Sequence, residues 1–387
     1  MTPPDDDSVD LVAFDPDSVG VGDVQCRPVW DDAFGAKSSC WVVETPSLSV
    51  CIDPGVAAMQ PSYPLPDVVK EYYARRADVA VRAALGEADL ATISHYHRDH
   101  YLDDPGAYDG TELWVKDPNR WINDSQWNRA REFVGALADR RGESLARCEP
   151  RQTDFADPLE SLDRARSKDF GEYQARREEL LAKWRERFRK RVERWRTADW
   201  LAEPEFLRYA DGERLERDET VVRFVGPLFH GIEYANTGWV FSVVVQTPDT
   251  KVIHSSDLQG PVIEDYADWL VEEDPDLLFL DGPATYLLGY MLNRTNLQRS
   301  IDNAARVLRE VDPELMVWGH HLLRDPRFRE RTREVWQLRE EGYNVETAAA
   351  LAGEEPIVER ILTWSDERVA RLADRAESAL DRETRTE

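Results

Sequence analysis

Short apolar runs recur along the first third of the chain, each bounded by Pro, Gly, Asp or Ser. Runs of aliphatic and β-branched residues between such polar positions predict strands. We expect strands at 9–14, 40–43, 48–52, 90–93 and 113–115. Helical periodicity between them predicts helices at 67–85 and 125–140, with Ser125 as a capping residue of the second.

The same alternation resumes in the second half. Strands are expected at 221–225, 239–245, 252–255, 277–280 and 315–318, and helices at 262–272, 297–311 and 327–341. Two strand-rich halves, each followed by helices, predict one α/β domain over residues 1–387, a four-layer αββα sandwich. A charged helical extension is expected at 354–387, and the sequence shows no internal repeat.

Residues 158–208 form an insertion between the halves, which we expect to be a helical arm without strands. Its apolar residues repeat every three or four positions, which places them in one stripe on a long helix: Leu181, Trp184, Phe188, Val192 and Trp195. Within it, residues 163–196 carry 13 Arg or Lys against 7 Asp or Glu. This basic segment could attract nucleic acid, or its cations could pair with acidic neighbours.

The formal charge changes the picture further, because it is −27 and only 7 of the 49 basic residues are Lys. An acidic, lysine-poor surface favours a halophilic protein, since concentrated salt screens the self-repulsion. The acidic start and the lack of a long apolar run predict a cytoplasmic protein with no membrane partner. The four cysteines are scattered, and we expect free thiols.

The candidate chemistry is concentrated in one segment. Three of the seven histidines fall within six residues, at His95, His97 and His100, together with Asp99. They directly follow the predicted strand 90–93, and the ends of strands are where α/β folds place their sites. Alternation along an extended segment sends His95, His97 and Asp99 to one side, and a following turn brings His100 beside Asp99. The segment can therefore serve two metals.

This His-x-His-x-Asp-His segment after a strand resembles the signature of the metallo-β-lactamase superfamily. The resemblance implies three later ligands after strands, which we find as His230, Asp257 and His320 or His321. Longer stretches are similar to an uncharacterised archaeal family of metallo-β-lactamase-like hydrolases that has no assigned substrate: 52–56, 94–101, 256–261, 281–290 and 320–325. The resemblance covers most of the chain except the arm and the termini.

The resemblance implies a centre of two divalent transition-metal ions. By residue-by-residue carry-over, His95, His97 and His230 hold one metal. Asp99, His100 and His320 hold the other, and Asp257 bridges them. Zinc suits this imidazole-rich set, and the carboxylates also admit manganese or iron. Two such metals lower the pKa of a shared water, so a metal-bridged hydroxide is the expected nucleophile.

Four further residues have less certain parts in this scheme. Of the two adjacent histidines, we assign His320 as the ligand, and we expect His321 and Arg324 to act as catalytic residues with Asp99, meeting substrate or protonating the leaving group. Asp53 is either a partner that orients a ligand imidazole or a turn residue. His254, inside a predicted strand, is expected to be a core histidine rather than a ligand.

These residues predict a metal-dependent hydrolase acting on an ester, a lactone or a phosphodiester, with a small-molecule or phosphodiester substrate as its partner. The first alternative is a nuclease that recruits nucleic acid through residues 163–196. The second is a metal-stabilised binding or scaffold protein, which the complete set of ligands disfavours. A redox di-iron role is disfavoured because His97 stands where redox members of the superfamily have Glu.

Overall fold

Two seven-stranded sheets face each other in this computed structural model, which describes residue 11 and residues 14–384. The first sheet contains, in spatial order, β1 (Val19–Val21), β2 (Val24–Asp31), β3 (Ser39–Glu44), β4 (Ser49–Ile52), β5 (Leu90–Ile93), β6 (Glu112–Val115) and β9 (Leu207–Tyr209). The second contains β10 (Arg214–Arg217), β11 (Thr220–Phe229), β12 (Trp239–Gln246), β13 (Lys251–His254), β14 (Leu277–Asp281), β15 (Leu315–Gly319) and β16 (Val345–Glu346). A separate pair joins β7 (Arg147–Cys148) to β8 (Trp200–Leu201).

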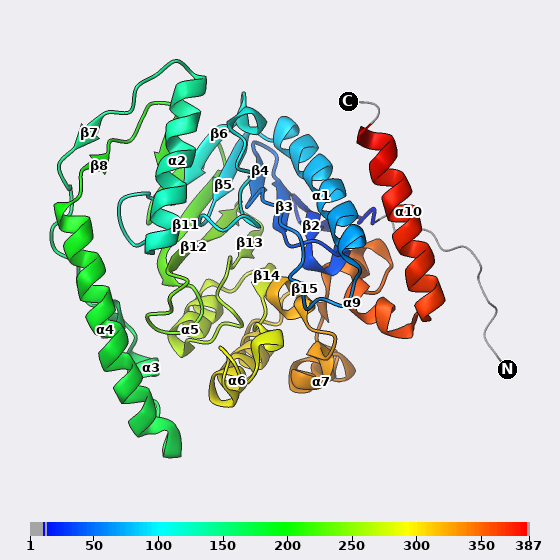
Figure 1. The fold of residues 1–387 in the computed structure, drawn as a ribbon. Helices are drawn as coiled ribbons and strands as arrows, with labels where there is room; N and C mark the ends of the chain where they lie inside the picture. The colour runs from blue at the N-terminus through cyan, green and yellow to red at the C-terminus, as the bar shows by residue number, and fades with distance from the viewer. Residues whose placement is uncertain (1–10, 12–13, 385–387) are drawn as a thin grey trace.

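Helices cover both outer faces of the sheets, which confirms the predicted four-layer αββα sandwich (Figure 1). Helices α1 (Asp67–Glu87) and α2 (Asp124–Arg140) lie over the first sheet, and α10 (Asp366–Thr384) packs on α1. Helices α5 (Glu264–Glu273), α6 (Arg294–Val311) and α7 (Phe328–Arg331) lie over the second. The remaining helices are α3 (Asp163–Ser167), α4 (Gln174–Thr197), α8 (Arg333–Trp336) and α9 (Ile357–Arg360).

The interior lies between the two sheets. Trp41 of β3 stacks on Phe279 of β14 with ring centroids 3.8 Å apart, and Trp114 of β6 stacks on Phe224 of β11 at 5.0 Å. Strand β12 is apolar at nearly every position and buried on both faces, which is what the middle of a covered sheet requires. These contacts hold the two sheets in a fixed relation, so the loops at one sheet edge can form a rigid site.

The two sheets have the same plan. In each, the first three strand pairings are antiparallel and the last three are parallel. This duplication of topology has no counterpart in the sequence, where we found no repeat. Parallel neighbours place their carboxyl ends at one edge of a sheet. Chain segments that leave β4, β5, β13, β14 and β15 therefore meet at a common edge.

Helix α4 extends along one side of the sandwich (Figure 1). Its predicted apolar stripe packs into an aromatic cluster of the main fold. Trp195 and Phe188 lie 5.5 Å and 5.9 Å, centroid to centroid, from Trp239, and Phe188 lies 5.8 Å from Tyr234. The stripe is thus explained by packing, and α4 is attached firmly to the strand ends that surround the site.

The expectation of an arm without strands is wrong at its carboxyl end. Residues 158–208 contain β8, and Leu207 begins β9, which pairs in parallel with β6 and completes the first sheet. The run is short and is interrupted by charged residues, so periodicity does not identify it. Its pairing partner lies about ninety positions earlier in the chain, between Leu113 and Val115.

Several other predicted elements differ from the structure. In the run 9–14, Leu11 and Phe14 lie outside any strand, and residues 9, 10, 12 and 13 lie outside the described part. The helix expected at 327–341 is broken into α7, α8 and a 3-10 turn. Helix α2 is capped by the side chain of Asn123, which accepts from the Gln126 amide at 2.7 Å, and not by Ser125. No helix in the described residues is long and apolar enough to cross a membrane.

Candidate metal centre

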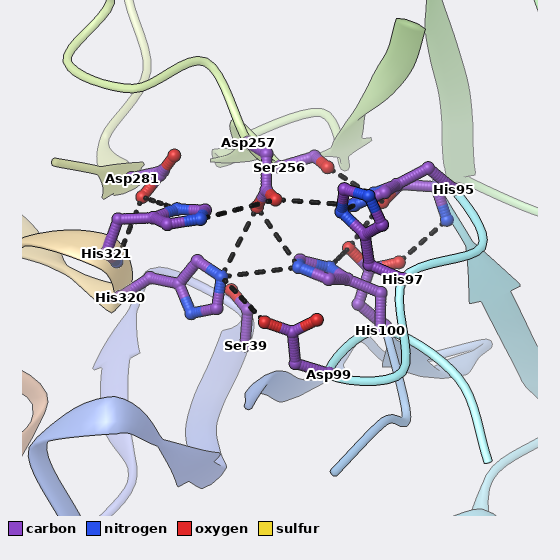
Figure 2. A network of polar contacts seen from close by, with 12 residues as sticks. Ser39, His95, His97, Asp99, His100, Ser256, Asp257, Asp281, His320 and His321 are labelled. Carbon is purple, nitrogen blue, oxygen red and sulfur yellow. Dashed lines mark hydrogen bonds and ion pairs between the residues drawn. The ribbon is translucent and has the colours of Figure 1, made fainter. Parts of the chain in front are cut away.

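The ligand-type residues lie at the ends of strands along one edge of both sheets. The segment from His95 to His100 follows β5, and His230 directly follows β11. Asp257 comes three residues after β13, and His320 and His321 directly follow β15. Every residue predicted to bind a metal is thus brought to one place, although the residues come from both halves of the chain (Figure 2).

Asp257 occupies the middle of the cluster, and its two carboxylate oxygens face different histidines (Figure 2). Oδ2 lies 3.3 Å from His95 Nε2 and 3.2 Å from His230 Nε2. Oδ1 lies 3.1 Å from His100 Nε2 and 3.4 Å from His320 Nε2. This is the position that a carboxylate bridging two cations requires.

The first ligand group consists of His95, His97, His230 and Asp257, whose ligand atoms all lie within 4.8 Å of one another. Its histidines are held by neutral partners. Ser94 Oγ lies 3.1 Å from His95 Nδ1, and Gln126 Nε2 lies 3.2 Å from His97 Nε2. His230 has no hydrogen-bond partner at either ring nitrogen within the described structure.

The second ligand group consists of Asp99, His100 and His320, which meet the same distance criterion. Its histidines are held by carboxylates. Asp53 Oδ2 lies 2.8 Å from His100 Nδ1, and Asp32 Oδ1 lies 3.1 Å from His320 Nδ1. A carboxylate behind a ligand imidazole orients the ring and raises its basicity.

Arg324 joins this second group by pairing with two carboxylates. Its guanidinium donates to Asp99 Oδ2 at 2.8 Å and also pairs with Asp32. Burial opposes ionisation of Asp99, but Arg324 and His100 hold the pKa of its carboxyl well below the usual range. Asp99 is therefore a positioned carboxylate at the edge of the cluster.

The imidazoles of the two groups differ in protonation. Burial lowers the pKa of His95, His97 and His230 to about 3. Burial also acts on His100, but Asp257 and Asp53 outweigh it and raise its pKa to about 10. Near neutral pH the first group thus presents neutral imidazoles, whereas a cation entering the second must displace protons.

The backbone around the cluster is held in unusual conformations. Asp53, Ser256 and His320 have φ of 49°, 52° and 52°, the left-handed region that non-glycine residues rarely adopt. At Gly55 a Cβ atom would lie 2.1 Å from the Tyr101 backbone nitrogen and 2.2 Å from that of His100. Gly55 is therefore required for the close approach of the 53–55 turn to the metal-binding loop.

These residues fit a pair of metal ions. Both carboxylate oxygens of Asp257 are buried and lie close to four imidazoles, but neither has a hydrogen-bond partner. Both ring nitrogens of His230 are also buried without a hydrogen-bond partner. Buried polar atoms without a partner cost free energy, and a shared cation would satisfy all of them at once. The donor set of imidazoles and carboxylates suits zinc, manganese or iron.

His321 faces the cluster but has a different environment from His320. Its Nδ1 lies 3.0 Å from Asp281 Oδ1, and its Nε2 lies 4.0 Å from Asp257 Oδ2 (Figure 2). Burial and the nearby Arg324 keep the pKa of His321 well below its usual value. His321 also belongs to a third possible ligand set with Asp257 and His320, so it remains an alternative ligand.

The two open sequence interpretations can be compared with these contacts. Asp53 accepts from the Ser94 amide at 2.7 Å and contacts His100, so it orients a ligand imidazole and also makes the turn before Gly55. His254 is buried, and its Nε2 contacts Ser39 Oγ at 3.1 Å, away from the ligand sets. It is a core histidine, as expected.

Sequence reasoning missed four residues that surround the centre: Asp32, Lys37, Arg129 and Asp281. Asp32 and Asp281 support His320 and His321, and the other two line the cavity over the metals. Only Asp281 had a usable signal, because it ends a predicted apolar strand just as Asp53 does. The others come from a turn and from a helix face, where no motif marks them.

The basic arm is largely neutralised where it meets the main fold. Arg185 pairs with Asp157, Arg177 with Glu233 at 2.7 Å and Arg194 with Asp124 at 2.6 Å. Other cations of α4 pair with acidic residues on the same helix. Lys183 and Lys190 are exposed and have no ion pair among the described residues.

The sandwich and the order of its ligand-type residues agree with what the sequence resemblance to the metallo-β-lactamase superfamily implies. No family model matches the chain. It is 30% identical over 349 residues to the UPF0282 protein of Methanopyrus kandleri, covering 87% of this chain and 95% of that protein. A UPF0282 protein of Korarchaeum cryptofilum is 30% identical over 80% of this chain and 82% of its own length. The chain belongs to the UPF0282 family of archaeal proteins.

Solved structures resemble the fold at low sequence identity. An isothiocyanate hydrolase from Delia radicum gut bacteria has a TM-score of 0.41 and 13% identity, covering 81% of this chain and 94% of that one. CmlA, a diiron β-hydroxylase from Streptomyces venezuelae, scores 0.37 at 12% identity over 80% of this chain and 51% of its own. A metallo-β-lactamase of Cronobacter sakazakii scores 0.29 at 9% identity over 93% and 89%. We draw no conclusion about activity from these likenesses.

Proposed function

We propose that the protein is a metal-dependent hydrolase that acts on an ester, a lactone or a phosphodiester. One observation carries the proposal: each carboxylate oxygen of Asp257 faces a separate group of ligand-type side chains. A structural metal site is a closed one, in which protein ligands occupy every position and no substrate can reach the ion. Two adjoining groups that open on a cavity favour catalysis instead.

The residues that would hold the metals follow from the two groups. His95, His97 and His230 would hold one ion and Asp99, His100 and His320 the other, with Asp257 shared. When bound, two such ions supply Lewis-acid polarisation of the scissile group and a water of lowered pKa as nucleophile. We propose zinc as the metal, with manganese and iron as alternatives.

His321 is placed to handle the proton of the leaving group. Asp281 Oδ1 lies 3.0 Å from Nδ1, so the other ring nitrogen, Nε2, faces Asp257, and His321 also lines the cavity. A histidine with one ring nitrogen held by a hydrogen bond keeps a fixed orientation. We therefore assign His321 the transfer of a proton at Nε2, and Asp281 the positioning of that ring.

Asp99 and Arg324 are paired with each other, and both line the cavity. Arg324 holds Asp99 Oδ2 at 2.8 Å, so this carboxylate keeps one orientation as a ligand and as an acceptor for a proton of water. The Arg324 guanidinium also lines the cavity, where it can meet a substrate oxygen. The Arg324 guanidinium is already paired with Asp32 and Asp99, so its main role is to position these two carboxylates.

The test is a substrate panel on protein stripped of metal and reloaded with zinc, manganese or iron. Nitrophenyl esters, lactones, bis(nitrophenyl) phosphate and labelled RNA are assayed from low to molar salt, because the composition favours function in salt. We expect metal-dependent hydrolysis of at least one class and its loss in Asp99→Ala, with little change in unfolding temperature. No hydrolysis of any class by folded, fully loaded protein contradicts the proposal.

A nuclease is the second candidate function of the same centre. The observation in its favour is the pair of exposed, unpaired arm cations, Lys183 and Lys190. If the arm recruits a phosphate backbone, replacing both with Gln lowers RNA affinity and flattens its salt dependence. Unchanged affinity and salt dependence remove the arm as support for this function.

A further inference from the structure

A cavity of about 490 Å³ opens over the metal centre. His97, Asp99, His230 and His321 form its floor, and Trp184 of α4 contributes to its wall. This volume lies in the range of pockets that enclose small molecules, about 300–1,000 Å³. The cavity is therefore large enough to enclose a small molecule.

The charge of this cavity is opposite to that of the protein. In a chain of net charge −27, its lining contains Lys37, Arg98, Arg129 and Arg324 and a single acidic residue, Asp99. Arg98 and Arg324 are compensated by ion pairs with Asp103 and with Asp32 and Asp99. The other two cations lack such compensation.

Lys37 and Arg129 make no ion pair in the described part of the chain, although Asp99 lies near enough to raise the pKa of both against the lowering effect of burial. The Lys37 ammonium makes no hydrogen bond or ion pair there, although the residue is only partly exposed. Arg129 contacts only Ser125, at 3.3 Å to the carbonyl oxygen and 3.4 Å to the hydroxyl. Burial and the neighbouring Arg324 lower the pKa of Lys37, so its surroundings do not favour the cation.

A partly buried cation without an ion pair costs free energy. The chain has 76 Asp and Glu against 49 Lys and Arg, so carboxylates that could pair with these cations are plentiful elsewhere in it. One use for the two cations is to offset the acidic residues of the centre. Two divalent ions, however, would bring four positive charges to the centre, where the carboxylates of Asp99, Asp257, Asp53 and Asp32 then serve the metals and their ligands. Lys37 and Arg129 are left without a carboxylate of their own, and an anion from outside can pair with them.

One wall of the same cavity is apolar. Trp184, Ile232, Leu287, Met291 and Leu292 line it, and Met291 keeps 63% of its surface exposed. Exposed apolar side chains beside a polar centre mark a surface that a ligand covers. The cavity thus offers positive charge on one side and apolar surface on the other.

We propose that this cavity binds a small amphipathic anion, with its charged oxygens held by Lys37 and Arg129 beside the metals and its apolar group against Trp184, Leu287 and Met291. This inference rests on the proposed function and narrows it. The substrates are then phosphodiesters, or esters and lactones that carry an acidic group, rather than neutral ones. The basic residues select the charge, and the metals act on the bond.

Binding of two dyes tests the proposal without any turnover. Anilinonaphthalene sulfonate and phenylnaphthylamine share an apolar ring system and differ in the sulfonate. We expect the metal-loaded protein to bind the anionic dye more tightly, and Lys37→Gln with Arg129→Gln to weaken it at least about tenfold while the neutral dye is unaffected. Trp184→Ala should weaken both dyes, which locates them in the cavity.

Arg131→Gln is the matched control for Arg129→Gln, because it removes one guanidinium from the same helix, α2. Arg131 contacts Asn119 and the Asp199 carbonyl and does not line the cavity, so the anionic dye should bind this variant as it binds the parent protein. Equal loss in the double variant and in Arg131→Gln, or no loss in either, overturns the proposal.

Turnover separates this proposal from the proposed function. With bis(nitrophenyl) phosphate the double variant should show a KM raised about tenfold and a smaller change in kcat, and with a neutral nitrophenyl ester neither should change. If the parent protein hydrolyses no class of the full substrate panel, the hydrolase proposal fails and the dyes still decide the charge preference. If it prefers the neutral ester and the variant leaves KM unchanged, the anion proposal fails and the hydrolase stands.

Discussion

The two ligand groups share Asp257 but are supported by different chemistry. In the first group, the Ser94 hydroxyl contacts His95 and the Gln126 side-chain amide contacts His97, whereas His230 has no hydrogen-bond partner among the described residues. Behind the second stand the carboxylates of Asp53 and Asp32. The first group is therefore preformed and neutral, whereas the second is more basic and depends on its supporting residues. The difference predicts that the two metals respond differently to mutation.

The largest effect is expected from Asp257→Ala, which removes the residue that the groups share. We expect metal content to fall from two ions to none, because each group loses the ligand that both share and the negative charge that lies between them. Elemental analysis after dialysis measures it. Retention of one ion would show that Asp257 serves a single group.

The next effect separates the groups. His230→Ala should release the first metal and His320→Ala the second, since each variant leaves the other group intact. His321→Ala is the matched control and should retain both ions while losing turnover. If His321→Ala releases a metal and His320→Ala does not, the assignment of the adjacent histidines is reversed.

A smaller effect is expected from the supporting carboxylates. Asp53→Asn keeps a residue that tolerates the positive φ at this position but removes the charge behind His100. Loss of such a supporting residue typically weakens a metal about 10–100-fold. Competition with a graded series of chelators should show one weakened ion and one unchanged. Equal weakening of both would mean that the groups are not independent.

The last effect is on stability rather than on metal content, and it concerns the loop that carries His230. Glu233 on this loop pairs with Arg299 at 2.8 Å and Arg177 at 2.7 Å, and these cations lower its pKa to about 2 against the effect of burial. From the ordinary value of 4.5, this shift corresponds to about 3 kcal/mol. The stabilisation should be complete above about pH 4.5 and lost as pH falls toward about 2.

Urea unfolding of metal-free Glu233→Gln measures this contribution. The variant should be less stable than the parent protein at pH 7, and the difference should shrink as pH falls below about 4.5. Glu216→Gln, which breaks an exposed pair with Arg214, is the control and should change little. A difference that stays constant with pH would mean that the ionised carboxylate of Glu233 is not its source.

The sandwich could be predicted from the sequence, and the candidate ligands could be picked out, because both leave local signals. Buried strands such as β12 are continuous apolar runs, and the segment from His95 to His100 is one loop. Edge strands such as β9 and β10 are short and charged, and only their pairing makes them strands. Lys37 and Arg129 were missed for a related reason: they reach the cavity from elements far apart in the chain, which no spacing reveals.

Metal content of the unmodified protein, measured by elemental analysis after reloading and gel filtration, decides whether this is a two-metal centre. We expect two transition-metal ions per chain, with a chelator removing them in two steps because the groups are supported differently. One ion per chain, or none in correctly folded protein, would contradict the bridged centre and the hydrolase proposed from it.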